Sequence, residues 1–121
     1  MLHHVSIEVP IIEVEDCARF FELIGFARVP EPEMLRGNVT WLERNGTQVH
    51  FIHTDGATVP VLGHAAIVAE DFDATCERLR DGGFQVEDAN ELWGERRAFA
   101  IAPGGHRVEL MAAPPPATEG V

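Results

Sequence analysis

The sequence contains no lysine and no tyrosine, and all nine of its basic residues are arginine. The missing lysine excludes a Schiff-base amine and a phosphate-loop lysine, and the missing tyrosine excludes a phenolic acid or base. Nine basic residues against 20 acidic ones give a net charge of −11. Because nucleic acid and anionic membranes require concentrated positive charge, we expect neither as a partner.

Long hydrophobic runs and a basic, serine-rich leader are also absent. The sequence therefore predicts no membrane span and no targeting segment, which indicates a cytoplasmic protein. A length of 121 residues with 45% hydrophobic content is sufficient for one domain with a buried core. The only two cysteines, Cys17 and Cys76, lie in helical patterns, where we expect reduced core residues.

The second half of the sequence repeats the first half. An offset of 58 to 60 residues matches His4 with His64, Cys17 with Cys76, Gly25 with Gly83, Gly46 with Gly105, and His50 with Glu109. A repeat of this length sets the architecture of a chain. The two copies together supply three imidazoles and one carboxylate. This is a complete ligand set for a divalent transition metal, namely Zn, Ni, Co, Mn or Fe(II).

Each copy predicts the order βαβββ, which gives an α+β fold of two tandem modules. In the first copy we expect strands at 3–9, 26–30, 38–44 and 47–53, with a helix that ends at Gly25. In the second copy we expect strands at 63–68, 84–87, 96–101 and 106–111, with a helix that begins after Asp71. The modules span 3–54 and 62–113 of a single domain, 1–113, and 114–121 forms a flexible proline-rich tail.

Residues two positions from a candidate ligand share its face of the strand. By this rule Ser6 and Glu8 accompany His4, Gln48 accompanies His50, and Arg107 accompanies Glu109, so all four are candidate substrate contacts. Trp41 is a further candidate because its ring can stack on an aromatic ligand, although a place in the core or an interface is equally compatible. The other three histidines lie on opposite faces and are expected to be surface or packing residues: His3, His53 and His106.

Several motifs together resemble the vicinal oxygen chelate superfamily, which is also called the glyoxalase, bleomycin-resistance and extradiol-dioxygenase group. They are Leu2-x-His4-Val5, Phe20-Phe21-x3-Gly25-Phe26, 45–50 (NGTQVH), 63–67 (GHAAI) and 103–110 (PGGHRVEL). The resemblance covers 2–113 and implies eight strands that form a curved sheet around a metal site. It places the usual ligands on His4, His64 and Glu109. His50 stands where glyoxalase I has a carboxylate ligand and where the acyl-CoA epimerases have glutamine.

This resemblance implies a metal-dependent lyase or isomerase that chelates a small-molecule substrate through two neighbouring oxygens. Glu109 is then the candidate catalytic base. The resemblance also implies a homodimer in which His4 and His50 of one chain join His64 and Glu109 of the other. Glu8 stands where glutathione-binding members carry arginine, and a negative charge there disfavours an anionic thiol.

Three alternatives share the same fold. An extradiol-type Fe(II) dioxygenase would use two histidines and Glu109, but such enzymes commonly add a tyrosine or another histidine. A fosfomycin-type thiol transferase would use His, His and Glu ligands, and its phosphonate would require a basic pocket, which the lack of lysine disfavours. A bleomycin-type binding protein would sequester a drug without a metal. Because such binders usually lose the ligands, the complete set here favours catalysis.

Overall fold

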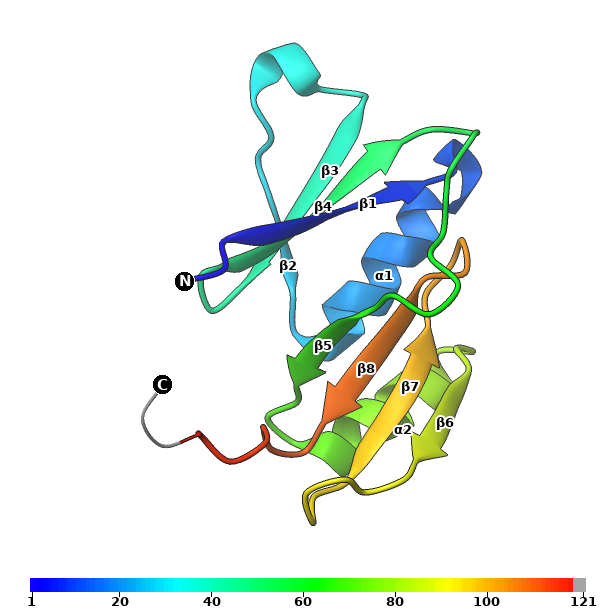
Figure 1. Ribbon diagram of the computed structural model, residues 1–121. Helices are drawn as coiled ribbons and strands as arrows, with labels where there is room; N and C mark the ends of the chain where they lie inside the picture. Colours follow the sequence, from blue (N-terminus) through cyan, green and yellow to red (C-terminus); the bar gives the residue numbers. More distant parts are fainter. Residues whose placement is uncertain (119–121) are drawn as a thin grey trace.

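The computed structural model, which describes residues 1–118, contains two successive βαβββ modules (Figure 1). The first comprises β1 (His4–Val9), η1 (Ile11–Glu13), α1 (Val14–Ile24), β2 (Ala27–Val29), η2 (Glu33–Leu35), β3 (Val39–Arg44) and β4 (Thr47–His53). The second comprises β5 (Ala65–Val68), α2 (Phe72–Asp81), β6 (Val86–Ala89), β7 (Arg97–Ile101) and β8 (Arg107–Met111). The predicted α+β class and tandem order are confirmed.

The strands form two four-stranded sheets, in the orders β1-β4-β3-β2 and β5-β8-β7-β6. The pairs β1–β4 and β5–β8 are parallel, and the remaining pairs are antiparallel. The first and last strands of each module therefore lie side by side. In this register Ser6 is opposite His50, and Ala66 is opposite Glu109. β1 and β5 are edge strands, so each has one side without a strand partner within the described residues.

One face of each sheet packs against the helices, and α1 contacts α2 (Figure 1). The helix-facing residues of the strands are buried and apolar, among them Leu42, Phe51, Ala98 and Leu110, each of which is 0% exposed. Because side chains alternate along a strand, the residues between them point to the other face. We call these other faces the open faces. The candidate ligands that lie in strands, namely His4, His50 and Glu109, are all on the open faces.

Most boundaries of the elements agree with the sequence to within one residue. The exceptions are β5, which begins at Ala65 and not at the predicted 63, and β6, which spans Val86–Ala89 and not the predicted 84–87. The predicted strand at 84–87 is wrong in its start, because β6 begins at Val86. The Phe84 ring instead packs edge-on against Phe20, with 5.3 Å between the centroids, and the Arg19 guanidinium lies 4.6 Å above it. Strand propensity favours a large aromatic residue within a strand, but packing between the modules leaves Phe84 outside β6. Between β2 and β3 the chain also forms the short helix η2.

The ends of the helices have the local structure that the sequence predicts. Gly25 ends α1 with φ at 113°, a left-handed conformation that suits glycine. At the N-terminus of α2, the Asp71 carboxylate accepts a hydrogen bond from the Ala74 backbone N–H at 3.1 Å. The helix α2 is therefore capped by a side chain.

Replacing Asp71 by alanine is expected to lower the free energy of unfolding by about 1 kcal/mol, because the cap is lost. Asp71→Asn should cost only a few tenths of that amount, roughly 0.3 kcal/mol, since asparagine caps almost equally well. Urea denaturation followed by circular dichroism measures both values. Equal destabilisation by the two variants would show that the carboxylate acts through its charge and not as a cap.

Both cysteines are free and buried, as predicted, and burial raises the pKa of Cys17 to about 12.

Residues 114–118 of the predicted tail are exposed and form no helix or strand, and 119–121 lie outside the described residues. None of the helices in the described part of the chain is long and apolar enough to cross a bilayer.

Candidate metal centre

The first pair of candidate ligands lies on the open face of the first sheet. His4 of β1 and His50 of β4 have stacked rings, with 4.1 Å between their centroids and 18° between their planes. Trp41 of β3 covers the other side of His50, also at 4.1 Å and nearly parallel at 6°. His50 is therefore only 7% exposed. We call His4 and His50 the first half-site. Trp41 supports it directly, and its role in contacting a substrate stays a prediction.

A chain of hydrogen bonds sets the protonation of His50. The amide nitrogen of Gln48 donates to Glu43 Oε1 at 3.0 Å, which directs its amide oxygen toward His50 Nε2 at 2.7 Å. Nε2 is then the protonated ring nitrogen, and the lone pair is at Nδ1. Burial, and then the nearby His4 and His3, lower the pKa of His50. A ring that stays neutral is suited to bind a metal.

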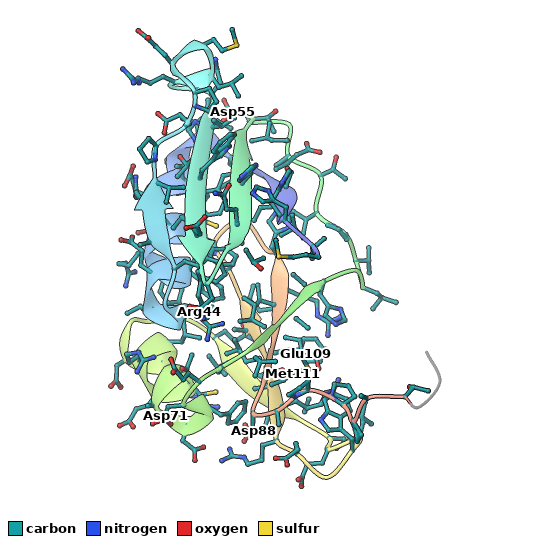
Figure 2. The ribbon with its side chains drawn as sticks, turned by 90° about the vertical axis from the view of Figure 1, so that its left-hand side faces the viewer. Arg44, Asp55, Asp71, Asp88, Glu109 and Met111 are labelled. Carbon is teal, nitrogen blue, oxygen red and sulfur yellow. The ribbon has the colours of Figure 1, made fainter. Side chains whose placement is uncertain are left out.

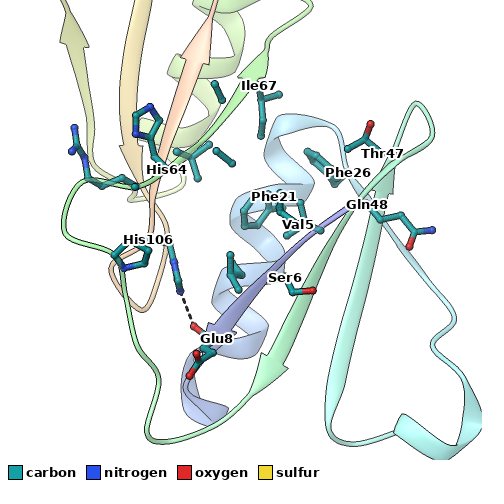
Figure 3. Close-up of a pocket in the computed structure, with 18 of the residues that line it drawn as sticks. Val5, Ser6, Glu8, Phe21, Phe26, Thr47, Gln48, His64, Ile67 and His106 are labelled. Atoms are coloured by element: carbon teal, nitrogen blue, oxygen red, sulfur yellow. Dashed lines mark hydrogen bonds between the residues drawn. The ribbon is translucent and has the colours of Figure 1, made fainter. Parts of the chain in front are cut away.

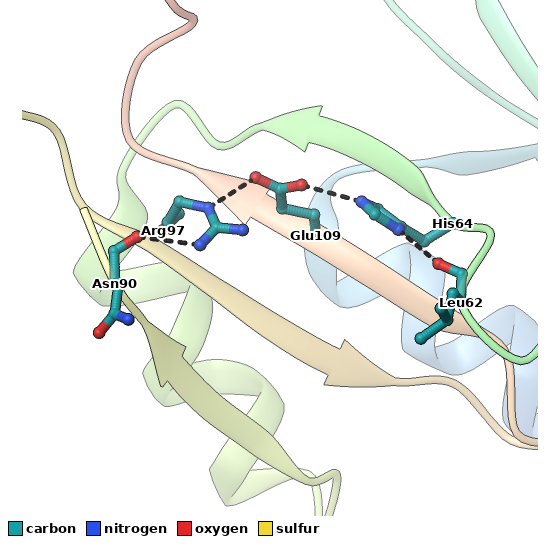
Figure 4. A network of polar contacts seen from close by, with 5 residues as sticks. All are labelled: Leu62, His64, Asn90, Arg97 and Glu109. Atoms are coloured by element: carbon teal, nitrogen blue, oxygen red, sulfur yellow. Dashed lines mark hydrogen bonds and ion pairs between the residues drawn. The ribbon is translucent and has the colours of Figure 1, made fainter. Parts of the chain in front are cut away.

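The second pair of candidate ligands lies at the second sheet (Figure 4), with Glu109 in β8 and His64 immediately before the start of β5. His64 Nε2 is 3.0 Å from Glu109 Oε1, and His64 Nδ1 is 2.9 Å from the Leu62 carbonyl oxygen. A carbonyl only accepts, so Nδ1 carries a proton and the lone pair of a neutral ring is at Nε2. Nε2 and the carboxylate are then two acceptors that face each other. A proton or a metal ion is therefore required between them. We call His64 and Glu109 the second half-site.

Arg97 fixes the carboxylate of the second half-site. Its Nε donates to Glu109 Oε2 at 3.0 Å, and its Nη1 donates to the Asn90 carbonyl at 2.9 Å (Figure 4). Glu109 is 7% exposed, although it lies on an open face. In Figure 2 it lies beside Met111 along β8. The sequence did not identify Arg97 as a partner of Glu109. No signal in the sequence identified this contact, because it depends on the register in which Phe99 pairs with Glu109.

The two half-sites do not meet within one chain. Among residues 1–118, no group of three or more His, Cys, Asp or Glu side chains is arranged to hold a metal. The four predicted ligands therefore form two pairs, one on each sheet, and no single point in one chain is surrounded by all four. Their chemistry still fits a divalent transition metal, because imidazole and carboxylate are its usual donors.

A pocket of about 510 Å³ lies between the edge strands β1 and β5 (Figure 3). Its apolar wall includes Val5, Phe21, Phe26 and Ile67. Four of the five predicted substrate contacts line it, together with His64 of the second half-site: Ser6, Glu8, Gln48 and Arg107. Trp41 is not among its lining residues.

Two of the three remaining histidines are packing residues, as expected. His106 is 6% exposed and donates through Nε2 to the Glu8 carbonyl at 2.7 Å, which joins the second module to β1. His53 contacts the Thr40 hydroxyl at 2.8 Å and the Gly37 carbonyl at 3.1 Å. His3 is exposed, and its Nδ1 lies 2.8 Å from Nδ1 of His4.

Comparisons with known proteins give a consistent result. The profile of the Glyoxalase/Bleomycin resistance protein/Dioxygenase superfamily matches residues 2–110. A glyoxalase family protein from Bacillus anthracis is 25% identical with a TM-score of 0.80, and the alignment covers 92% of this chain and 93% of that one. The fosfomycin resistance protein FosX from Listeria monocytogenes is 17% identical with a TM-score of 0.76, covering 94% and 91%.

A bleomycin-binding protein solved in complex with bleomycin is also 17% identical, with a TM-score of 0.64 and coverage of 91% and 98%. At these identities the last two likenesses concern the fold alone. None of the curated proteins matches the sequence.

Proposed function

Because the chain belongs to the Glyoxalase/Bleomycin resistance protein/Dioxygenase superfamily, we propose that it is a metal-dependent lyase or isomerase of the glyoxalase-like type. It would chelate a small oxygenated substrate through two vicinal oxygens. The observation that carries this proposal is the second half-site, where His64 Nε2 and Glu109 Oε1 face each other at 3.0 Å. These two acceptors require a proton or a metal ion between them, and a metal ion in that place would use both as ligands.

The ligands we propose are His4, His50, His64 and Glu109. A divalent metal held by these residues would supply a Lewis acid for a substrate oxygen. The Leu62 carbonyl and Gln48 orient the rings of His64 and His50. Arg97 holds Glu109 through Oε2, so Oε1 is the oxygen that can turn toward a substrate. We propose that Glu109 accepts a proton there from a carbon next to a carbonyl.

The proposed enzyme is a homodimer that shares its sites. Each half-site of one chain contains only two of the four proposed ligands. In the proposed dimer, the first half-site of one chain lies against the second half-site of the other chain, so that the two together make a complete set. In that arrangement His4 and His50 join His64 and Glu109 of the partner subunit. Within residues 1–118 the outer edges of β1 and β5 have no strand partner, which supports this association because exposed strand edges favour pairing with another chain.

Elemental analysis of protein purified without an affinity tag or chelator tests the proposal. The expected result is about one transition metal per chain, as for a single ligand set per chain. Nickel, zinc, cobalt or manganese would favour an isomerase, lyase or transferase, and iron would favour the extradiol dioxygenase. If no metal binds even after incubation with each ion, the enzyme proposal fails. The bleomycin-type binding protein would then be the better explanation.

A further inference from the structure

Arg107 differs from the other arginines in the contacts of its guanidinium. Within residues 1–118, the other eight of the nine arginines each donate a hydrogen bond or form an ion pair: Arg19, Arg28, Arg36, Arg44, Arg78, Arg80, Arg96 and Arg97. In the same part of the chain Arg107 does neither. Acidic side chains outnumber arginines by 20 to nine. A shortage of carboxylates therefore does not explain the unpaired guanidinium.

The Arg107 side chain is held beside the second half-site by an aromatic ring. Its guanidinium carbon lies 4.3 Å from the centroid of Phe99, whose ring also contacts His64 edge-on at 5.1 Å. Arg107 and Glu109 share the open face of β8, and two residues of strand separate them by about 7 Å. A cation–π contact holds the guanidinium by its flat face and uses none of its N–H donors. Those donors remain available to a ligand.

Within residues 1–118, no acidic side chain compensates the positive charge of Arg107. Arg97, the other arginine near Phe99, is neutralised by Glu109 at 3.0 Å. Glu8 is the one carboxylate that lines the same pocket, and its Oε1 accepts the Thr58 backbone N–H at 3.3 Å. Within the described residues, Glu8 forms no ion pair with Arg107. The pocket therefore presents an unpaired cation next to the proposed metal centre.

We propose that Arg107 binds an anionic group of the substrate and so determines the substrate class. The substrate is a small organic acid whose vicinal oxygens chelate the metal and whose second anionic group, a carboxylate or a phosphonate, lies on Arg107. This inference rests on the proposed function. It adds that the protein recognises a second negative charge of the substrate. That charge would lie about 7 Å along β8 from the carboxylate ligand Glu109.

Three probes with one chelating end and different distal groups test the proposal. They are 2-hydroxysuccinate, 2-hydroxy-3-phosphonopropanoate and the distally uncharged 2-hydroxybutyrate, titrated calorimetrically into the metal-loaded dimer. The anionic probes should bind more tightly than 2-hydroxybutyrate. Arg107→Gln should weaken their binding about 10- to 100-fold, as expected for a lost charged hydrogen bond, and change 2-hydroxybutyrate less than about two-fold. The anionic probe whose affinity falls more in Arg107→Gln identifies the group that Arg107 binds, a carboxylate or a phosphonate.

Two further variants and a metal-free measurement complete the test. Arg107→Lys should restore part of the lost affinity, and Arg36→Gln, which removes an exposed arginine paired with Glu31 at 3.8 Å, should change nothing. In metal-free protein, methylphosphonate or acetate should shift the NMR signal of the Arg107 Nε–H. If metal binds but distal charge and Arg107→Gln have no effect, this inference is overturned while the proposed function stands. If no metal binds but the NMR signal shifts, the proposed function fails and anion binding by Arg107 is retained.

Discussion

The Glu109→Gln variant is expected to lose its bound metal, with an affinity more than about 100-fold below that of the unchanged protein. Changes in residues that only support metal ligands cost about 10- to 100-fold, and the loss of an anionic ligand should exceed that range. The substitution keeps the shape of the side chain but removes the charge that faces His64 at 3.0 Å and Arg97 at 3.0 Å. Competition with a chromogenic chelator measures the affinity.

Glu87→Gln is the matched control for this variant. Glu87 is an exposed glutamate of β6 in the same sheet, and it accepts a hydrogen bond from the Gln85 side chain at 2.8 Å. Its replacement should leave metal affinity unchanged. Because Glu109→Gln leaves the nearly buried Arg97 without its carboxylate, circular dichroism should first establish that the variant is folded. A folded Glu109→Gln protein that holds metal as tightly as the unchanged protein would remove Glu109 from the ligand set.

A second large effect is expected when two metal-free variants are mixed. A chain with His4→Ala and His50→Ala lacks the first half-site, and a chain with His64→Ala and Glu109→Ala lacks the second. Neither homodimer should bind metal. After mild unfolding and refolding together, random association makes about half of the dimers heterodimers, each with one complete shared site. The mixture should then bind about one quarter of the metal bound by the unchanged protein.

The control for the mixing experiment combines chains that both lack a ligand of the first half-site. When His4→Ala chains are mixed with His50→Ala chains, every shared site still misses one ligand, so the mixture should bind no more metal than its two components separately. If all four ligands came from one chain instead, the first mixture would also show no gain. A gain in the first mixture alone therefore establishes that the site is shared.

Local chemistry made much of the fold predictable from the sequence. The repeat predicted two βαβββ modules, and Gly25 and Asp71 predicted helix ends. The turn between β3 and β4 lies at Asn45-Gly46, where both residues have a positive φ. These features depend on backbone conformation and on hydrogen bonds between residues close in the chain. The strand start near Phe84 was wrong because that ring packs against Phe20 of the other module. Strand propensity contains no information about such a distant partner.

The sequence also assigned the candidate ligands to their strand faces, since alternation along a strand depends only on position. It did not identify the residues that support them. Glu43 reaches His50 through Gln48, and Arg97 reaches Glu109 from the neighbouring strand β7. Both contacts depend on the register between strands. That register results from hydrogen bonding and packing across the whole sheet.

By itself, the sequence determined the family resemblance, the order of the elements and the four candidate ligands. Only the tertiary structure decided that these ligands form two pairs, that Trp41 packs on His50, and that Arg107 lacks an acidic partner within residues 1–118. The physical reason is that alternation fixes the direction of a side chain relative to its own strand. The distance between His50 and Glu109 depends on how the two modules pack through α1 and α2, and that packing depends on contacts between residues far apart in the chain.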